Sequence, residues 1–470
     1  MITAEEQIEL EALIVYEEAQ KCVNDFYAYC VFMDSSFFND KRPYLRDIAL
    51  IMQEIGDGKI KKAAISMPPR SGKSYIATMF CTWLIGKNPT GSIMRNSYAA
   101  ELAEKFSYEV RQIIKSDRYK LVFPTIELKS DKKAVNDWAI VGSKQTTYFC
   151  AGVGGAITGK GCDLVAIGDD LIKNIEDALS ENVLNKTWQW VTSTHNSRLE
   201  KGCAQIHIAT RWSRRDPIGM LLDAEPKEWT VYSVPALIDG KTFCEDVKTT
   251  QEFLEIKRLT DDFIWEAEYM QNPIEAKGLL YPIEELKRFS LEEVQKYENP
   301  KSKERWEATV NYTDTADEGT DYLASVTGKA LGRYIYLTDI VFTQDPVEVT
   351  EGRVSQLIID SNCDKSVFES NAGGKSFAKN VKELIKDSSK CHIVWKPSTK
   401  NKETRIFMKS GIVKEFVYFR NDYELGSDYD KFMRQLTSYV RMGTNKHDDA
   451  ADSITGLVDE MFRKSVEFLK

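Results

Sequence analysis

The chain has 470 residues, which is too long for a single hydrophobic core and suits two or three domains of roughly 100 to 200 residues each. Hydrophobic residues make up 42% and charged residues 29% of it, and this composition excludes a disordered or fibrous protein. The formal net charge of −9 gives no overall sign of a nucleic-acid partner. The 9 scattered cysteines, with no Cys-x-x-Cys pair, argue against a zinc site or a disulfide framework and favour a reducing compartment.

Residues 1–40 are predicted to form an N-terminal helical segment, because apolar side chains recur near helical spacing between acidic ones over residues 3–33. The segment lacks the basic start and the apolar core of a signal peptide. No apolar run approaches the roughly 18 residues that are needed to span a bilayer. We therefore expect a cytoplasmic protein that makes no contact with a membrane.

Residues 41–275 are predicted to form an α/β domain. Short apolar strands alternate with helical segments and are expected at 63–67, 92–98, 163–170, 204–212 and 230–237. This alternation predicts a mostly parallel sheet with helices on both faces. The polar and highly charged stretch that follows, residues 276–305, is interpreted as a linker.

Residues 306–470 are predicted to form a second α/β domain with a mixed sheet. Two apolar segments, 308–316 and 324–342, carry the glycine punctuation of antiparallel hairpin strands. Later strands are expected at 366–374 and 392–398, and a closing helix at 448–464.

The turn between the strand at 63–67 and the next helix has the sequence of a phosphate-binding loop. It consists of Arg70, Ser71, Gly72, Lys73 and Ser74. In such a loop the backbone N–H groups surround the phosphates, the lysine reaches the β and γ phosphates, and the serine hydroxyl binds Mg²⁺. The interpretation is a P-loop NTPase domain.

The match to this loop is partial, because the full signature has glycine at position 67, where this chain has Met67. A second element supports it: Asp169 and Asp170 end an apolar strand about 95 residues later. One carboxylate there can hold the Mg²⁺ water shell, and its neighbour can orient or deprotonate the attacking water. Asp170 alone could equally cap the next helix. The loop and the acidic pair together predict NTP hydrolysis.

Two further residues are candidates for the same site. Thr210 follows a third apolar strand, at a place where small polar residues of nucleotide motors sense the γ phosphate. The alternative is that Thr210 and Arg211 pair locally. Arg70 lies inside the loop and could supply transition-state charge in the manner of an arginine finger, or form a structural ion pair.

The second domain carries a series of carboxylates. They are Asp314, Asp321, Glu369, Asp448, Asp449 and Asp452. Two-metal phosphodiester cleavage needs three or four converging carboxylates. An aspartate on the first strand, a glutamate in mid-domain and an aspartate on a late helix follow the order of an RNase H-like fold. Taken singly, each carboxylate is more readily explained as structural, for example as a partner of a helix dipole.

A basic stretch lies within the second domain. Residues 375–420 contain 12 Lys or Arg and 4 Asp or Glu. This local positive charge could contact phosphate, although the ordinary explanation of a charge run is a solvated helix face.

Several motifs together give the chain a resemblance to the large terminase subunit of tailed bacteriophages and prophages, the motor that packages DNA into procapsids. The resemblance covers nearly all of the chain beyond the first 40 or so residues. The motifs lie at 67–74, 97–114, 151–174, 208–219 and 268–278, and in the segments around Asp314, Glu369 and Asp449.

For the first domain, the resemblance implies an ATPase that uses ATP and Mg²⁺. Lys73 and Ser74 would lie in the phosphate loop and Asp169 on the Mg²⁺ side. Asp170 would occupy the catalytic carboxylate position, where many relatives have Glu. Thr210 would lie in the motif that couples hydrolysis to DNA movement.

For the second domain, the resemblance implies an RNase H-like endonuclease that uses Mg²⁺ or Mn²⁺, with two ions held by Asp314, Glu369 and an aspartate from 448 or 449. The whole chain would translocate double-stranded DNA and cut concatemers. The implied partners are a small terminase subunit, the portal ring of the procapsid and further copies of the chain in a ring, within the cytoplasm of an infected bacterium.

Two other functions remain compatible with the residues. A helicase fused to a nuclease, of the kind used in DNA repair, would share both chemistries and would unwind strands. A P-loop ATPase with a non-catalytic DNA-binding domain would retain all of its activities without Asp314 or Glu369.

Overall fold

The computed structural model describes residues 4–157, 159–274, 278–299, 302, 304–315, 321–371, 373–397, 401–441 and 445–467. The chain divides into two compact units. The N-terminal unit comprises Met1–Leu254 and Phe263–Glu275, and the C-terminal unit comprises Glu255–Asp262 and Ala276–Lys470. Among the described helices, none combines the length and the apolar character that crossing a membrane requires.

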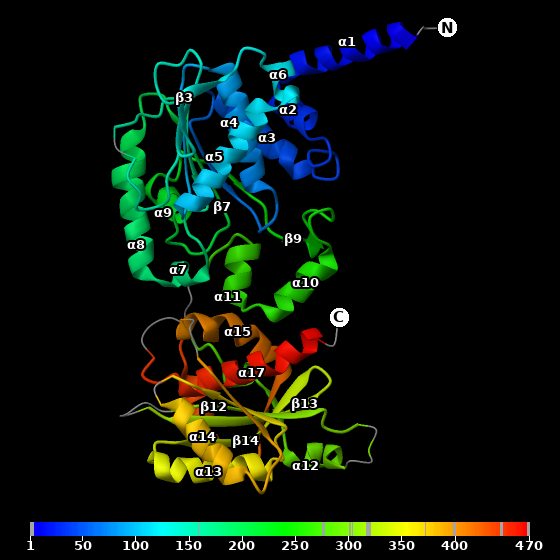
Figure 1. Cartoon of the computed structure of the whole chain (residues 1–470), viewed down its shortest axis with the longest axis vertical. Coiled ribbons are helices and arrows are strands. Elements are labelled where there is room, and N and C mark those ends of the chain that lie inside the picture. The colour runs from blue at the N-terminus through cyan, green and yellow to red at the C-terminus, as the bar shows by residue number, and fades with distance from the viewer. Residues whose placement is uncertain are drawn as a thin grey trace. The chain divides into compact units, whose positions relative to one another are not determined.

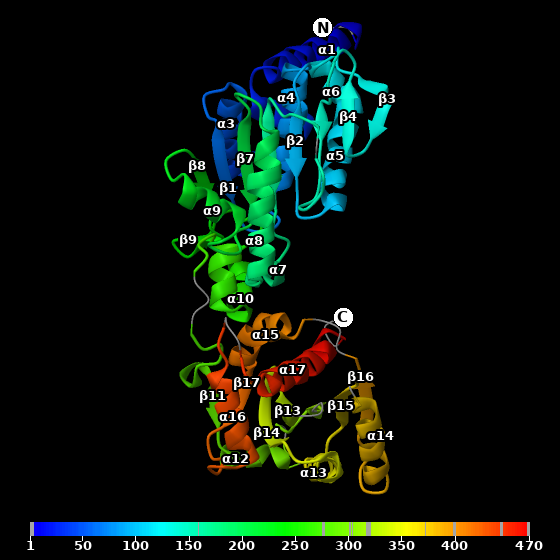
Figure 2. The same cartoon turned by 90° about the vertical axis from the view of Figure 1, so that its left-hand side faces the viewer.

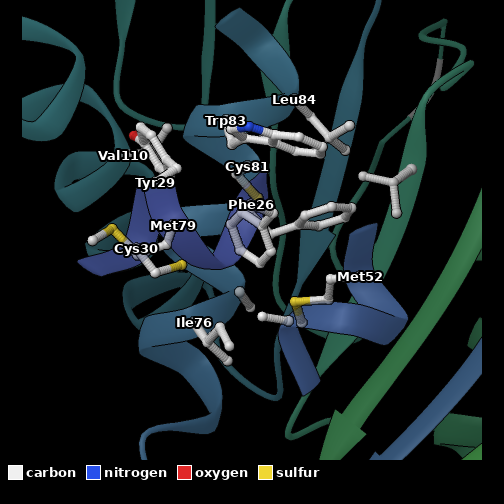
Figure 3. Close-up of a cluster of buried hydrophobic side chains, with 14 of the residues drawn as sticks. Phe26, Tyr29, Cys30, Met52, Ile76, Met79, Cys81, Trp83, Leu84 and Val110 are labelled. Atoms are coloured by element: carbon white, nitrogen blue, oxygen red, sulfur yellow. The ribbon is translucent and has the colours of Figure 1, made fainter. Parts of the chain in front are cut away.

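Residues 4–33 contain two helices where the sequence predicted one. Helix α1 spans Ala4–Cys22 and α2 spans Phe26–Met33. Asp25 separates them, because its side chain accepts the N–H of Ala28 at 2.8 Å and so caps a new helix. Phe26 and Tyr29 of α2 are buried against Trp83 and its neighbours on α4 (Figure 3). The α2 helix therefore belongs to the core of the N-terminal unit.

An eight-stranded sheet forms the centre of the N-terminal unit, in the order β3-β4-β5-β2-β6-β7-β1-β8. Its strands are β1 Lys62–Ser66, β2 Ile93–Asn96, β3 Leu128–Ala134, β4 Asp137–Ile140, β5 Tyr148–Phe149, β6 Val165–Asp169, β7 Ala204–Ala209 and β8 Thr230–Ser233. The run from β5 to β8 is parallel, and the two antiparallel pairs are β3 with β4 and β4 with β5. The predicted mostly parallel sheet is confirmed.

Three strands of this sheet end side by side. Strands β6, β7 and β1 are neighbours, with Asp169 in register with Ile208 and Ser66 in register with Ala209. The carboxyl ends of parallel strands meet at one edge of a sheet, which is where open α/β sheets bind ligands. The segments after Ser66, Asp169 and Ala209 therefore converge.

Helices surround the sheet, and Figure 2 shows α4, α5 and α8 along its strands. The remaining helices and short elements of this part of the chain are α3 Pro43–Gly56, α4 Lys73–Lys87, α5 Ala100–Lys115, α6 Asp117–Val122, α7 Ile175–Leu179, α8 Glu181–Trp190, the π-helix η1 Val191–His195, η2 Asn196–Arg198, α9 Pro217–Ala224, β9 Leu237–Ile238, β10 Lys241–Thr242, α10 Thr250–Leu259, α11 Asp262–Ile264 and the π-helix η3 Trp265–Tyr269.

The C-terminal unit is built on a seven-stranded mixed sheet in the order β11-β17-β14-β13-β12-β15-β16. The strands are β11 Lys287–Phe289, β12 Ala308–Asp314, β13 Leu323–Leu331, β14 Tyr334–Thr343, β15 Lys365–Glu369, β16 His392–Lys396 and β17 Val417–Arg420. Strands β12, β13 and β14 are antiparallel neighbours, and the other pairs are parallel. The mixed sheet agrees with the prediction.

Helices cover both faces of the second sheet, with α15 and α17 on one side and α13 and α14 on the other (Figure 1). Its helical elements are η4 Ile283–Glu285, α12 Leu291–Val294, η5 Gln295–Glu298, α13 Val347–Asp360, α14 Gly374–Ile385, α15 Lys402–Phe416, α16 Asp428–Ser438 and α17 Asp449–Glu467. The stretch 276–305, interpreted from sequence as a linker, contains β11, which pairs with β17. Strand β11 has only three residues, of which Phe289 is buried, so the polar composition of the stretch gave no sign of a strand.

Candidate functional site

The phosphate-binding loop turns the chain from β1 into α4. Arg70 and Gly72 both have left-handed backbones, with φ of 68° and 84°. A Cβ on Gly72 would lie 2.5 Å from the ring of Phe37, so the position requires glycine both for conformation and for space. Helix α4 starts at Lys73 and runs for 15 residues. Its N-terminal N–H groups and its dipole therefore provide an anion site at the end of β1.

Lys73 is buried inside the loop. Its Nζ donates to the carbonyls of Met67 at 3.1 Å and Pro68 at 3.2 Å, and to Thr210 Oγ1 at 2.9 Å. Burial lowers the pKa of this lysine, and the carboxylates of Asp170 and Asp169 oppose that shift. The loop lysine and the residue after β7 are thus in direct contact, as their predicted roles at one nucleotide site require.

Asp169 lies at the end of β6 and is fully buried. Ser74 Oγ donates to its Oδ1 at 2.9 Å. Arg95 of β2 forms an ion pair with its Oδ2 at 2.5 Å and also donates to Thr78 Oγ1. Sequence reasoning missed Arg95, although an arginine within an otherwise apolar strand was a detectable signal. Arg95 therefore stabilises the negative charge of the Asp169 carboxylate next to the phosphate loop.

Asp170 has a left-handed backbone with φ of 48°. Its Oδ1 accepts the N–H of Thr210 at 3.0 Å. Burial raises the pKa of Asp170, and the nearby Lys73 ammonium works against that increase. The residue therefore bridges the ends of β6 and β7 and does not cap a helix.

Arg211 and Thr210 are adjacent in the chain but have different side-chain partners. Arg211 forms a buried ion pair with Asp216 at 2.9 Å, and Asp216 also caps α9. Local pairing thus explains Arg211, whereas Thr210 contacts Lys73.

A cavity of about 420 Å³ opens over the loop. Its lining includes all five loop residues, Asp170, Thr210 and Trp212, and also Glu268 of η3. Sequence reasoning assigned Glu268 no role, although it begins one of the quoted motifs. Burial raises its pKa to about 7.

The second site is a group of three carboxylates in the C-terminal unit. Ligand atoms of Asp314, Glu369 and Asp452 lie within 4.8 Å of one another. Asp314 and Glu369 end the adjacent parallel strands β12 and β15, and Asp452 lies in the first turn of α17. The helix approaches the sheet closely, because a Cβ on Gly456 would meet the ring of Tyr312 at 2.3 Å.

Two carboxyl groups of this cluster, those of Asp314 and Asp452, have raised pKa values. The pKa of Asp314 is raised to about 8, chiefly by burial and further by the charges of Asp452 and Glu369. Burial also raises the pKa of Asp452. The Tyr312 hydroxyl donates to Glu369 Oε2 at 3.0 Å and holds that side chain in place. Such crowding of like charges is typical of a site that a cation completes.

Two cations of α15 neutralise the group, and sequence reasoning missed both. Lys402 Nζ lies 3.6 Å from Asp314, 3.3 Å from Asp452 and 2.8 Å from Asp448. Arg405 contacts Asp452 and lies 3.6 Å from Glu369. Both belong to the basic stretch that the sequence suggested for phosphate contact.

The other candidate carboxylates lie outside the group of three. The Asp448 carboxylate pairs with Lys402, which also lies near Asp314 and Asp452. Asp449 accepts from Gln435 Nε2 at 3.2 Å. The spacing predicted that Asp452 shares a helix face with either Asp448 or Asp449, and the structure brings Asp452 to β12.

Much of the basic stretch 375–420 is paired internally. Lys396 pairs with Glu460 at 2.5 Å, Lys409 with Asp459 at 2.7 Å and Lys414 with Asp261 at 3.3 Å. The exposed lysines on α14 are Lys375, Lys379 and Lys382. The net positive count of the segment therefore overstates the charge that is available to a partner.

Two family models match the sequence. The model described as "Terminase large subunit, T4likevirus-type, N-terminal" matches residues 64–288, and the model described as "Terminase Bacteriophage T7, Ribonuclease H-like domain" matches residues 313–413. Together they cover well over half of the chain. The chain belongs to the large terminase subunits. Its role is that of the DNA-packaging ATPase and nuclease, and its second unit has the RNase H-like fold. A comparison with curated protein sequences finds no significant match.

Solved structures that resemble this terminase subunit include two phage large terminases and a terminase nuclease domain of human cytomegalovirus. The large terminase of a thermophilic bacteriophage is 11% identical to this chain, and the match covers 87% of this chain and 98% of that terminase, with a TM-score of 0.48. The large terminase of bacteriophage HK97 is 10% identical, covers 88% and 93%, and has a TM-score of 0.36. The terminase nuclease domain of human cytomegalovirus is 10% identical, covers 37% and 88%, and has a TM-score of 0.30.

Proposed function

We propose that this terminase subunit hydrolyses ATP at the loop 70–74 to move double-stranded DNA and cuts DNA at the carboxylates of its second unit. The observation that carries the proposal is the separation of the two constellations into two compact units. Each unit holds the complete set of residue types that its reaction needs. Neither set contains a residue of the other unit.

In the ATPase, the loop N–H groups and Lys73 bind the phosphates. The Ser74 hydroxyl and the Asp169 carboxylate lie 2.9 Å apart and are hard oxygen donors, so they fit Mg²⁺. The metal would supply charge neutralisation to the phosphates. Asp170 presents its second carboxylate oxygen to the attacking water, and Arg70 offers positive charge from within the loop. Thr210 reports the state of the phosphates through its contact with Lys73.

In the nuclease, Asp314, Glu369 and Asp452 fit a divalent cation, because three carboxylates converge and carboxylate oxygens suit Mg²⁺ and Mn²⁺. Bound there, such a cation would activate water and stabilise the leaving oxygen. Asp448 and Asp449 flank the cluster at the start of α17 and are proposed to serve a second ion. Tyr312 holds Glu369 in position.

Membership of the family supports the partners of this function. We propose that the chain acts on double-stranded DNA together with a small terminase subunit and the portal ring of a procapsid. We further propose that it forms a homo-oligomeric ring during packaging, in the cytoplasm of an infected bacterium.

The test is plasmid cleavage with Mg²⁺ or Mn²⁺, with ATP hydrolysis recorded on the same samples. Asp314→Ala should abolish cutting and leave ATP turnover within about twofold of the wild type, because the sites lie in different units. Asp387→Ala, which removes an exposed carboxylate of the same unit, is the matched control and should cut normally. Cutting by Asp314→Ala at the wild-type rate would refute the nuclease assignment.

A further inference from the structure

Glu268 lies on the wall of the nucleotide cavity and has no part in the function proposed above. It belongs to the π-helix η3, Trp265–Tyr269. Single π-turns inside helices are rare and are frequent at functional sites. The inference drawn from this residue rests on the proposed ATPase function and concerns the same cavity.

The segment around Glu268 is firmly anchored beside the end of β7. The rings of Trp265 and Tyr269 stack with centroids 5.0 Å apart. Gln271 has a left-handed backbone with φ of 58°, is buried, and accepts the N–H of Arg211 at 3.1 Å through its Oε1. Its Nε2 donates to the Glu268 carbonyl. These contacts fix the position of Glu268 relative to Thr210, the neighbour of Arg211.

The side-chain carboxylate of Glu268 takes no part in these anchoring contacts. Within the described part of the chain, its oxygens accept no hydrogen bond and form no ion pair, although Lys73 is close enough to lower its pKa. A carboxylate in a sheltered wall without a bonded partner costs stability. The other carboxylate in the cavity lining belongs to Asp170, and it accepts the N–H of Thr210. Glu268 is therefore available to a molecule inside the cavity.

We propose that Glu268 is a second catalytic carboxylate of the ATPase and accepts the proton of the attacking water. Asp170 is a short side chain whose Oδ1 is already bonded, so it orients the water, whereas the longer Glu268 is free to take the proton. The water oxygen bonds to the γ phosphorus as the bond from that phosphorus to the β–γ bridging oxygen breaks. ADP leaves with the electron pair of that bond. The water proton passes to the Glu268 carboxylate and then to solvent. A base whose pKa lies near neutrality suits this role.

The test compares ATP turnover and nucleotide binding in the full-length chain. Glu268→Gln keeps the shape and removes the base, so kcat should fall by about 100-fold or more, while the Kd for a fluorescent ADP analogue stays within about threefold. Glu268→Asp should recover part of the lost kcat. The matched control is Glu266→Gln, on the same π-helix but not in the cavity lining, and it should turn over normally.

Other outcomes would overturn the inference. Turnover by Glu268→Gln within about threefold of the wild type would refute it and would leave the ATPase assignment intact. A Glu268→Gln protein that loses binding as strongly as turnover would indicate a structural role, and so would a Glu268→Asp protein with no recovery. Absence of ATP turnover in the wild type would refute the proposed ATPase itself and this inference with it.

Discussion

The two acidic sites of this terminase subunit differ in how their negative charge is balanced. Asp169 is paired with Arg95, which is fully buried and enters from the neighbouring strand β2. The cluster of Asp314, Glu369 and Asp452 is balanced by Lys402 and Arg405 at the start of a helix, and Lys402 remains 37% exposed. In the first site the cation is part of the sheet and supports the carboxylate from behind. In the second, the cations contact the same oxygens that a metal would bind.

This difference predicts separable activities, and the largest expected effect comes from Lys73→Ala. The loop then lacks the Lys73 hydrogen bond to Thr210 and the positive charge of Lys73 toward the phosphates, so ATP turnover should fall by at least about 100-fold. Metal-dependent plasmid cutting by the same sample should stay within about twofold. A folded Lys73→Ala protein that loses both activities would contradict the separation of the sites.

The buried cation should be structural. Arg95→Met leaves the Asp169 carboxylate buried and unpaired and should destabilise the N-terminal unit by about 3 to 5 kcal/mol, as measured by urea unfolding. The control is Lys105→Met, which breaks an exposed pair with Glu109 at 3.9 Å and should cost about 0.5 kcal/mol or less. Equal losses of stability for the two variants would contradict a structural role for Arg95.

The second site should depend on pH. Because the folded pKa of Asp314 is raised to about 8, the folded state holds a proton that the unfolded chain releases near pH 4. This group therefore makes the unit less stable as pH rises from about 4 to about 8. Mn²⁺ must displace that proton, so its affinity should increase by roughly 50-fold between pH 6 and pH 8, as measured by calorimetry. Asp314→Asn should show a flatter profile, and an unchanged one would contradict the assignment.

The smallest effect is expected from the competing cation. Lys402→Met removes an ammonium that lies within 3.6 Å of Asp314 and Asp452, so Mn²⁺ should bind the cluster a few-fold more tightly at pH 7. Lys409→Met removes a lysine of the same helix that pairs with Asp459 away from the cluster, and it should leave Mn²⁺ binding unchanged. Weaker Mn²⁺ binding by Lys402→Met would show that the lysine supports the metal site and does not compete for it.

The sequence alone was sufficient to predict the two α/β units, the phosphate loop and the acidic pair at 169–170. These features depend on local rules: the period of apolar residues, the left-handed turn at Gly72, and the meeting of parallel strand ends at one edge. The order of Asp314 and Glu369 was also readable, because each ends an apolar strand.

Only the tertiary structure revealed Arg95, Glu268, Lys402 and Arg405. Each lies beside residues far away in the chain, as Arg95 lies beside Asp169, 74 positions later. Spacing placed Asp452 on one helix face with Asp448 or Asp449 but did not decide which face packs on β12. That choice depends on the close approach of Gly456 to Tyr312. Local patterns determine where a chain turns and alternates, whereas the partner of a buried charge is determined by packing between segments that the sequence keeps apart.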